Sequence, residues 1–355
     1  MMSRIQNLRK EMKERNLQAV IIYKPQNRRY ISGFTGSAGY ALITEDKAIF
    51  FTDFRYIQQA SNQCKDFEIL EISKVKSVTE YLNEMNIETL GFEDDFMDFA
   101  TYSKFTDELK NTKLVPLKGL MLNLRSIKDE EEINMIAKAA QIADKAFEHI
   151  LSFIKPGVCE RDLYLEIEHF MKKNGASGVS FEPIVASGKR SSLPHGVASE
   201  KIIEDGDFLT LDFGCIYNGY CSDMTRTIVV GKASDEQKKI YNIVLEAQTK
   251  ALEAVRPGIT GEELDKIARD IITKEGYGDK FGHGLGHGVG LEVHELPHVN
   301  SIGKDPLRAG MVITDEPGIY IPDFGGVRIE DLILVTEEGY KVLSNSPKEL
   351  IELKY

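Results

Sequence analysis

Apolar and polar residues alternate with two different periods in the first third of the chain. Residues 3–17 place apolar side chains at helical spacing, which predicts a helix. Residues 19–23 form a continuous apolar run typical of a buried strand, and the runs 40–44 and 48–52 predict two strands joined by a polar turn. Because helical and strand patterns keep alternating beyond this point, we expect an α/β domain over residues 1–120.

The second domain, expected over residues 121–355, contains the same pattern twice. Lys155–Val158 reappears as Arg256–Ile259 at an offset of 101 residues, and Gly206–Asp212 reappears as Gly310–Glu316 at an offset of 104. A repeat of this length predicts two similar halves that pack against each other. Ligand sites commonly form where such halves meet, so the acidic residues and histidines of the repeats are the candidates for a site.

Two aspartates of the first repeat can be placed by hairpin geometry. The strands on either side of Asn218-Gly219 form a predicted hairpin, because this dipeptide is the strongest short hairpin signal. A two-residue turn pairs Asp212 with Thr225 and puts Asp223 diagonally on the same face, with the two aspartate Cα atoms roughly 7 Å apart. Two carboxylates this close repel each other unless a cation or a shared proton lies between them. The alternative of solvent-facing strand acids is disfavoured by the apolar flanking residues.

The second repeat offers two further carboxylates. Its matching strand ends at Glu316, and Glu330 lies beyond a glycine-rich turn whose length leaves its face open. Strand alternation points Asp315 to the face opposite Glu316. Four carboxylates at one cleft suit two divalent ions with oxygen ligands, Mn²⁺ above all, with Co²⁺, Zn²⁺ or Fe²⁺ as alternatives.

A glycine-rich segment over residues 282–294 holds three of the seven histidines. Its glycines oppose a stable helix and let the backbone approach a ligand closely. This density of His283, His287 and His294 favours a binding site over three structural histidines. His195 occupies the corresponding loop of the first repeat, where a functional and a structural role are equally open.

Residues 294–298 match the letters of the H-E-x-x-H zinc-protease motif. That motif works only on a continuous helix, which brings both histidines to one face. Pro297 removes a helical hydrogen bond and costs about 3 kcal/mol or more in a helix interior. We therefore reject the motif.

Charge and cysteine content narrow the class of protein. The formal net charge of −12 argues against nucleic acid or an anionic membrane as a partner. The four cysteines show no CxxC pair and no framework spacing, which is typical of reduced thiols in a cytoplasmic protein. No apolar run approaches the length needed to span a bilayer.

These motifs resemble the pita-bread metallopeptidases of the M24 family, in the branch of the Xaa-Pro aminopeptidases and prolidases. The resemblance covers nearly the whole chain, and residues 27–39 and 52–56 are similar to the aminopeptidase P type. It implies an α+β fold in which a small α/β creatinase-like domain precedes a pseudo-symmetric, duplicated catalytic domain. The metal ligands that it implies are Asp212, Asp223, His287, Glu316 and Glu330.

The resemblance also implies how the site works. Two divalent ions, bridged by Asp223 and Glu330, would hold a bridging hydroxide that attacks the peptide bond. Glu316 would act as general base, and His195 and His294 would donate hydrogen bonds to the substrate and the developing oxyanion. A homodimer is also implied. The surrounding pocket is implied to include His283, His298, Tyr320 and Arg328.

One residue bears on substrate length. Prolidases of this family often carry an arginine after the His-Glu-x-Pro segment, where it would hold the carboxylate of a dipeptide. His298 stands there in this chain and is a weaker carboxylate anchor. We therefore expect an Xaa-Pro aminopeptidase, with an Xaa-Pro dipeptidase as the alternative. A catalytically silent binding or chaperone module, or a creatinase-type hydrolase, is disfavoured because every implied ligand is present.

Overall fold

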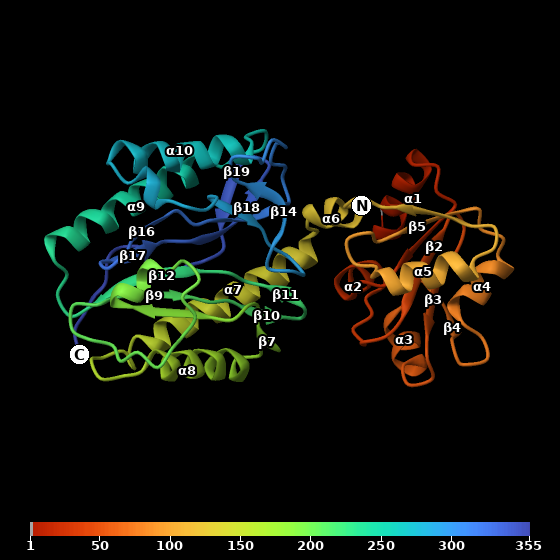
Figure 1. Cartoon of the computed structure of the whole chain (residues 1–355), viewed down its shortest axis with the longest axis horizontal. Helices are drawn as coiled ribbons and strands as arrows, with labels where there is room; N and C mark the ends of the chain where they lie inside the picture. Colours follow the sequence, from red (N-terminus) through yellow and green to blue (C-terminus); the bar gives the residue numbers. More distant parts are fainter. Residues whose placement is uncertain (1–2) are drawn as a thin grey trace. The chain divides into compact units, whose positions relative to one another are not determined.

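The computed structural model describes residues 3–355, which divide into two compact units. The first unit ends at Arg125 and the second begins at Ser126. Figure 1 colours the chain along its length, so that the first unit is red to orange and the second runs from yellow to blue. Separate hydrophobic clusters lie inside the first unit and inside the second, as expected of separately packed domains.

The first unit is an α/β domain built on one mixed sheet. Its elements are α1 (Arg4–Glu14), β1 (Ala19–Ile22), α2 (Pro25–Ser32), β2 (Tyr40–Thr44), β3 (Ala48–Thr52), α3 (Ile57–Gln63), β4 (Glu68–Glu71), α4 (Val78–Glu84), β5 (Thr89–Phe92), α5 (Phe99–Glu108), β6 (Lys113–Pro116) and α6 (Leu120–Ser126). The strand order is β4-β3-β2-β1-β5-β6. The helix and the three strands predicted first from the sequence are confirmed as α1, β1, β2 and β3. Helix α1 ends early because Asn16 adopts a left-handed φ of 55°.

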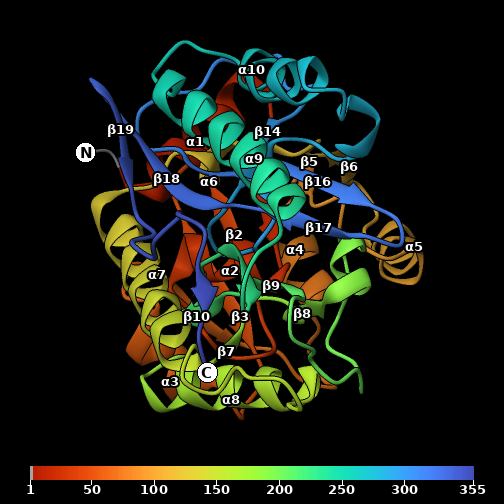
Figure 2. The same ribbon diagram turned by 90° about the vertical axis from the view of Figure 1, so that its left-hand side faces the viewer.

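The second unit is a duplicated α+β domain. Its long helices are α7 (Glu130–Ile150), α8 (Glu160–Lys173), α9 (Asp235–Ala254) and α10 (Gly261–Lys274). Figures 1 and 2 show α7 and α8 on one side of the strands and α9 and α10 on the other. Each helix pair covers its own hydrophobic cluster. The two similar halves predicted from the repeat are therefore present, and the equivalent Gly157 and Gly258 before α8 and α10 share a left-handed φ of 92° and 90°.

The strands of the second unit form several small sheets. Their bounds are β7 (Gly178–Val179), β8 (Ile184–Ser187), β9 (Phe208–Asp212), β10 (Cys215–Tyr217), β11 (Tyr220–Cys221), β12 (Thr225–Val230), β13 (Gly286–Gly288), β14 (Glu295–Val299), β15 (Val312–Asp315), β16 (Gly318–Ile321), β17 (Gly325–Arg328), β18 (Asp331–Thr336), β19 (Gly339–Val342) and β20 (Glu352–Leu353). The short helices are η1 (Gly188–Ser192) and η2 (Gly278–Lys280). The sheet orders are β11-β10-β7, β20-β12-β9-β8, β14-β13-β15-β18-β19 and β16-β17.

The first hairpin has the predicted register. Tyr217 lies opposite Tyr220, and Asp212 lies opposite Thr225. Asn218-Gly219 forms the turn with φ values of 44° and 77°, as a primed turn requires. The pairing that the sequence predicts is thus confirmed at both ends of the hairpin.

The two strands of this hairpin are interrupted where the sequence predicts continuous strands. Between β9 and β10 the backbone of Gly214 approaches Ser222 so closely that a Cβ atom would lie 1.8 Å from the Ser222 carbonyl oxygen. Ser180 donates a hydrogen bond of 2.8 Å to the same carbonyl. The interruption leaves Asp223 between β11 and β12, outside the regular ladder.

The register of the second hairpin shows on which face Glu330 lies, which the sequence leaves open. The ladder pairs Asp315 with Asp331 and continues in the same register beyond a short gap. Glu316 therefore lies opposite Glu330. The turn at the far end spans residues 322–324 between β16 and β17.

Asp315 faces away from Glu316, as strand alternation predicts. Its Oδ2 accepts a hydrogen bond of 3.3 Å from Gln248, which also donates to Asp331 at 3.2 Å. Lys348 lies 2.7 Å from the Asp331 carboxylate. The back of the ligand-bearing strands thus has its own buried polar cluster.

The H-E-x-x-H letters do not lie on a helix. Glu295–Val299 forms strand β14, which confirms the rejection of that motif. Over residues 3–355, no helix combines the length and apolar character that crossing a membrane requires.

Candidate metal centre

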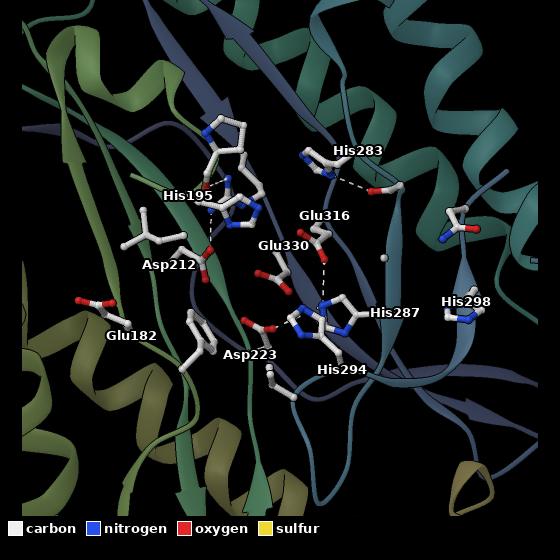
Figure 3. A pocket seen from close by; sticks show the side chains of 18 of the residues that line it. Glu182, His195, Asp212, Asp223, His283, His287, His294, His298, Glu316 and Glu330 are labelled. Atoms are coloured by element: carbon white, nitrogen blue, oxygen red, sulfur yellow. Dashed lines mark hydrogen bonds and ion pairs between the residues drawn. The ribbon is translucent and has the colours of Figure 1, made fainter. Parts of the chain in front are cut away.

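A cavity of about 420 Å³ in the second unit collects the predicted site residues. It is lined by the loop after β8, the first hairpin, the glycine-rich segment and the second hairpin. Figure 3 shows carboxylates and histidines converging from these segments. Tyr320 does not line the cavity but bonds to two residues that do, His283 and Arg328. The predicted residues in the lining are His195, Asp212, Asp223, His283, His287, His294, His298, Glu316, Arg328 and Glu330.

Four of the five predicted ligands cluster tightly. Asp223, His287 and Glu330 each present a ligand atom, and these atoms lie within 4.8 Å of one another. His287 Nε2 also lies 3.2 Å from Glu316 Oε1 and 3.7 Å from Asp223 Oδ2. Nitrogen and oxygen donors from both repeats therefore surround one point in the cavity.

Asp212, the fifth predicted ligand, is held by a guanidinium. Arg328 NH2 donates to Asp212 Oδ2 at 2.5 Å, and its NH1 donates to the Tyr320 hydroxyl at 2.8 Å. The Nε of the same arginine donates to Thr225 Oγ1 at 3.1 Å, and that hydroxyl donates to Glu330 Oε2 at 2.7 Å. One chain of hydrogen bonds thus connects a predicted ligand of the first repeat to a predicted ligand of the second.

A second threonine, Thr314, donates a hydrogen bond to Glu316 as Thr225 does to Glu330. Thr314 Oγ1 donates to Glu316 Oε1 at 3.0 Å and accepts from the His287 backbone N–H at 3.0 Å. A role for Thr225 and Thr314 beside the carboxylates was not predicted from the sequence. The signal was available, because Thr225 pairs with Asp212 and Thr314 precedes Glu316 by two residues on the same strand face.

Asp223 and Glu330 are buried carboxylates, which bears on whether a cation fits the site. Burial, together with neighbouring carboxylates, raises the pKa of each well above its ordinary value. The Glu330 Oε1 atom is buried without a hydrogen-bond partner among the described residues. Buried carboxylates are normally paired or coordinate a metal. The donor set, with its hard oxygens and one imidazole, fits divalent ions.

His287 and Glu316 are electrostatically linked. Burial disfavours the charged imidazolium, but the carboxylates of Glu316 and Asp223 outweigh this effect and raise the pKa of His287 to about 9. Burial also opposes ionisation of Glu316, yet the contact with His287 lowers the pKa of Glu316 to about 2. Positive charge on His287 here compensates the carboxylates, and metal binding would release that proton because a ligating histidine is neutral.

The remaining histidines lie around this cluster. Burial lowers the pKa of His283 and of His294, which favours their neutral forms. His283 Nε2 lies 2.8 Å from the Tyr320 hydroxyl, and the rings of His287 and His294 are 4.3 Å apart. His298 is exposed and lies opposite His287 in the β13–β14 ladder.

Family models match almost the whole chain. Residues 134–337 match the metallopeptidase family M24, and residues 4–127 match the creatinase/prolidase N-terminal domain. The chain belongs to the M24 metallopeptidase family. This finding confirms the family, the creatinase-type N-terminal domain and the pita-bread catalytic domain that the resemblance implied, and it makes the protein a hydrolase whose family uses divalent metal ions.

Relatives and solved structures agree over the full length. The Xaa-Pro dipeptidase of Pyrococcus furiosus is 44% identical over 352 residues, which is 99% of this chain and 100% of that protein. A structure of the Xaa-Pro dipeptidase from Bacillus anthracis has a TM-score of 0.96 at 51% identity and covers 98% of both chains. The X-Pro aminopeptidase from Thermotoga maritima superimposes with a TM-score of 0.89 at 38% identity, over 95% of this chain and 98% of that one.

Proposed function

We propose that this M24 peptidase is a metal-dependent Xaa-Pro dipeptidase, a prolidase. The observation that carries the metallopeptidase chemistry is the convergence of acidic and imidazole side chains from both repeats on one cavity. The choice of a dipeptidase rests on the full-length similarity to Xaa-Pro dipeptidases of Pyrococcus furiosus and Bacillus anthracis. The sequence favoured an aminopeptidase, but these relatives support its alternative better. The similarity to the Thermotoga maritima enzyme keeps the aminopeptidase as the second candidate.

We assign two divalent ions to the ligand set. When bound, such ions lower the pKa of water and polarise the scissile carbonyl, so that hydrolysis proceeds near neutral pH. Manganese is our proposed native metal, with cobalt, zinc or iron as alternatives. The ligands that would hold the pair are Asp212, Asp223, His287, Glu316 and Glu330.

Glu316 is the residue we assign to proton transfer. Its carboxylate lines the cavity beside His287, so it is placed to accept a proton there. Oε1 already lies within hydrogen-bond distance of His287 and Thr314, so Oε2 is the oxygen we assign to receive the proton of the attacking water. The same oxygen would then deliver that proton to the proline nitrogen, which must be protonated to leave.

Two histidines that line the cavity are placed for hydrogen bonding with substrate. His294 has a lowered pKa and lines the cavity beside His287. His195 lines the same cavity from the loop of the first repeat. We assign both the role of donating hydrogen bonds to the substrate carbonyl as negative charge develops on it, which stabilises the transition state selectively. His298, which lines the cavity together with His283 and Asn300, is assigned to the substrate carboxylate.

The proposal is tested by comparing two substrates. An Xaa-Pro dipeptide and an Xaa-Pro-Pro tripeptide are offered to protein that has been stripped with EDTA and then supplied with Mn²⁺. A dipeptidase cleaves the dipeptide with the higher kcat/KM, and cleavage disappears in EDTA. Preference for the tripeptide would establish the aminopeptidase instead, and cleavage of neither with any divalent ion would refute the assignment to Xaa-Pro peptides.

The identity of the metal and the assembly state have direct measurements. Elemental analysis of protein purified without added metal reports the native ion and its stoichiometry, for which we expect two per chain. Sedimentation equilibrium reports the homodimer that we propose from the family resemblance.

A further inference from the structure

The loop that carries His195 is held at both ends by a buried carboxylate outside the metal centre. Glu160, at the start of α8, is 0% exposed. Its Oε1 accepts from the Ser187 backbone N–H at 2.7 Å and from the Ser187 hydroxyl at 2.9 Å. Its Oε2 accepts from the Ser199 N–H at 3.1 Å, from the Ser199 hydroxyl at 2.7 Å and from Arg190 NH1. These partners lie on both sides of His195 in the sequence.

Arg190 completes this arrangement from inside the loop. Its NH1 is paired with Glu160, and its NH2 donates to the carbonyl of Val197 at 2.8 Å. The loop between Ser187 and Ser199 is therefore tied to α8 at both ends and braced across its middle. His195 lies within the braced part and faces the catalytic cavity.

The second repeat holds its glycine-rich segment in the same way. Asp265 on α10 is 2% exposed and accepts from the Leu285 N–H at 3.0 Å. Arg269 forms a two-point pair with Asp265 at 2.8 and 2.9 Å. The same guanidinium donates to the carbonyls of Phe281 at 2.8 Å and His283 at 2.7 Å. A carboxylate–arginine pair again fixes the backbone that presents a cavity-lining histidine.

We propose that Glu160 and Asp265 are positioning residues for the peptidase reaction, each acting through the histidine of its own repeat. Glu160 with Arg190 places His195, and Asp265 with Arg269 places His283. The inference rests on the proposed function for its kinetic readout. It adds to that function two residues that touch neither the metal ligands nor the substrate cavity.

Physical reasoning supports a positioning role over simple stabilisation. A buried ion pair is often no more stabilising than apolar residues of the same volume, so burial alone does not explain Glu160. The carboxylate fixes the positions of both ends of the loop, because five donor groups from three residues bond to its two oxygens. Catalytic hydrogen bonds depend on such precision, and a displacement of about 1 Å can reduce the rate roughly 100-fold.

The kinetic test is a pair of crossed double-mutant cycles on the metal-loaded enzyme. We expect Glu160→Gln to lower kcat/KM roughly 100-fold and to have no further effect once His195→Ala is present. In the His283→Ala background, Glu160→Gln should still lower kcat/KM roughly 100-fold, so that the effects of the two substitutions multiply. Asp265→Asn should show the opposite pattern, losing its effect only in the His283→Ala background. If Glu160→Gln and His195→Ala multiply, the proposal is overturned.

A matched control and a readout without catalysis complete the experiment. Glu166→Gln makes the same substitution on the same helix, in a pair with His149 that lies outside the loop, and should leave kcat/KM unchanged. Hydrogen exchange of Glu160→Gln should be faster in residues 188–199, by roughly tenfold or more, and unchanged in residues 281–287. Uniform acceleration would refute the proposal. If the wild-type protein cleaves no Xaa-Pro peptide, the proposed function fails. The exchange pattern still tests whether Glu160 holds the loop that carries His195.

Discussion

Thr225→Val is the substitution that probes the link between the two repeats most directly. Thr225 is 0% exposed, and its hydroxyl donates to Glu330 at 2.7 Å while accepting from Arg328 at 3.1 Å. Valine has nearly the same shape but removes both hydrogen bonds, the one from the Arg328 guanidinium and the one to the Glu330 carboxyl group. A buried hydrogen bond to a charged group contributes about 1.5–3 kcal/mol and a neutral one about 1 kcal/mol, so we expect the free energy of unfolding to fall by about 3 kcal/mol. For a unit of this size, that corresponds to a melting temperature roughly 6–12 °C lower.

The assay is thermal and urea unfolding of EDTA-treated protein, with Thr210→Val as the matched control. Thr210 lies on the neighbouring strand β9, is 2% exposed and bonds through its hydroxyl to Thr227 at 3.3 Å. Thr227 keeps its bonds to the Arg328 backbone in that variant. Loss of one neutral hydrogen bond should cost about 1 kcal/mol. Equal losses in the two variants would show that Thr225 is an ordinary buried threonine and would refute the reasoning.

Four further predictions follow from the site. Asp223→Asn should abolish metal binding and hydrolysis while the protein stays folded, as checked by elemental analysis, activity and circular dichroism. His294→Ala should lower kcat far more than metal content; a parallel fall would make it structural. His298→Arg should raise kcat/KM about tenfold for dipeptides over tripeptides, since a bidentate guanidinium holds a carboxylate better. The raised pKa values of Asp223 and Glu330 give stability that is complete below the unfolded-state pKa near 4 and lost as pH rises through the folded-state pKa. Metal-free protein should therefore melt at a lower temperature at about pH 8 than at about pH 5, and Mn²⁺ should remove that difference.

Local chemistry explains why the first hairpin could be predicted in detail. The Asn218-Gly219 turn fixes the register by itself, and a period of two then fixes which residues share a face. The pairing of Asp212 with Thr225 follows without any tertiary information. The second hairpin carries no such turn signal. Its register depends on the three-residue turn over residues 322–324, which the sequence does not specify.

Tertiary contacts explain what the sequence could not provide. Glu160 looks like an ordinary acidic residue in the first turn of a helix, where the helix dipole favours it. Its partners Ser187, Arg190 and Ser199 are 27, 30 and 39 residues away, and no pattern in the sequence connects them. The break at Gly214 was missed for the same reason, because it depends on the approach of Ser222 across the hairpin.

The exchange of partners between the repeats bears on how the metal centre can form. Glu330 of the second repeat receives a hydrogen bond from the Thr225 hydroxyl of the first, and its backbone N–H donates to the Thr225 carbonyl at 3.1 Å. Conversely, Asp212 of the first repeat is held by Arg328 of the second. Asp212 and Glu330 are thus each oriented by the other repeat, so docking of the halves and organisation of these two carboxylates are one event. Because the docked halves bring buried carboxylates together, a bound cation stabilises the docked state over the unfolded chain, and metal binding is thermodynamically coupled to folding of the catalytic unit.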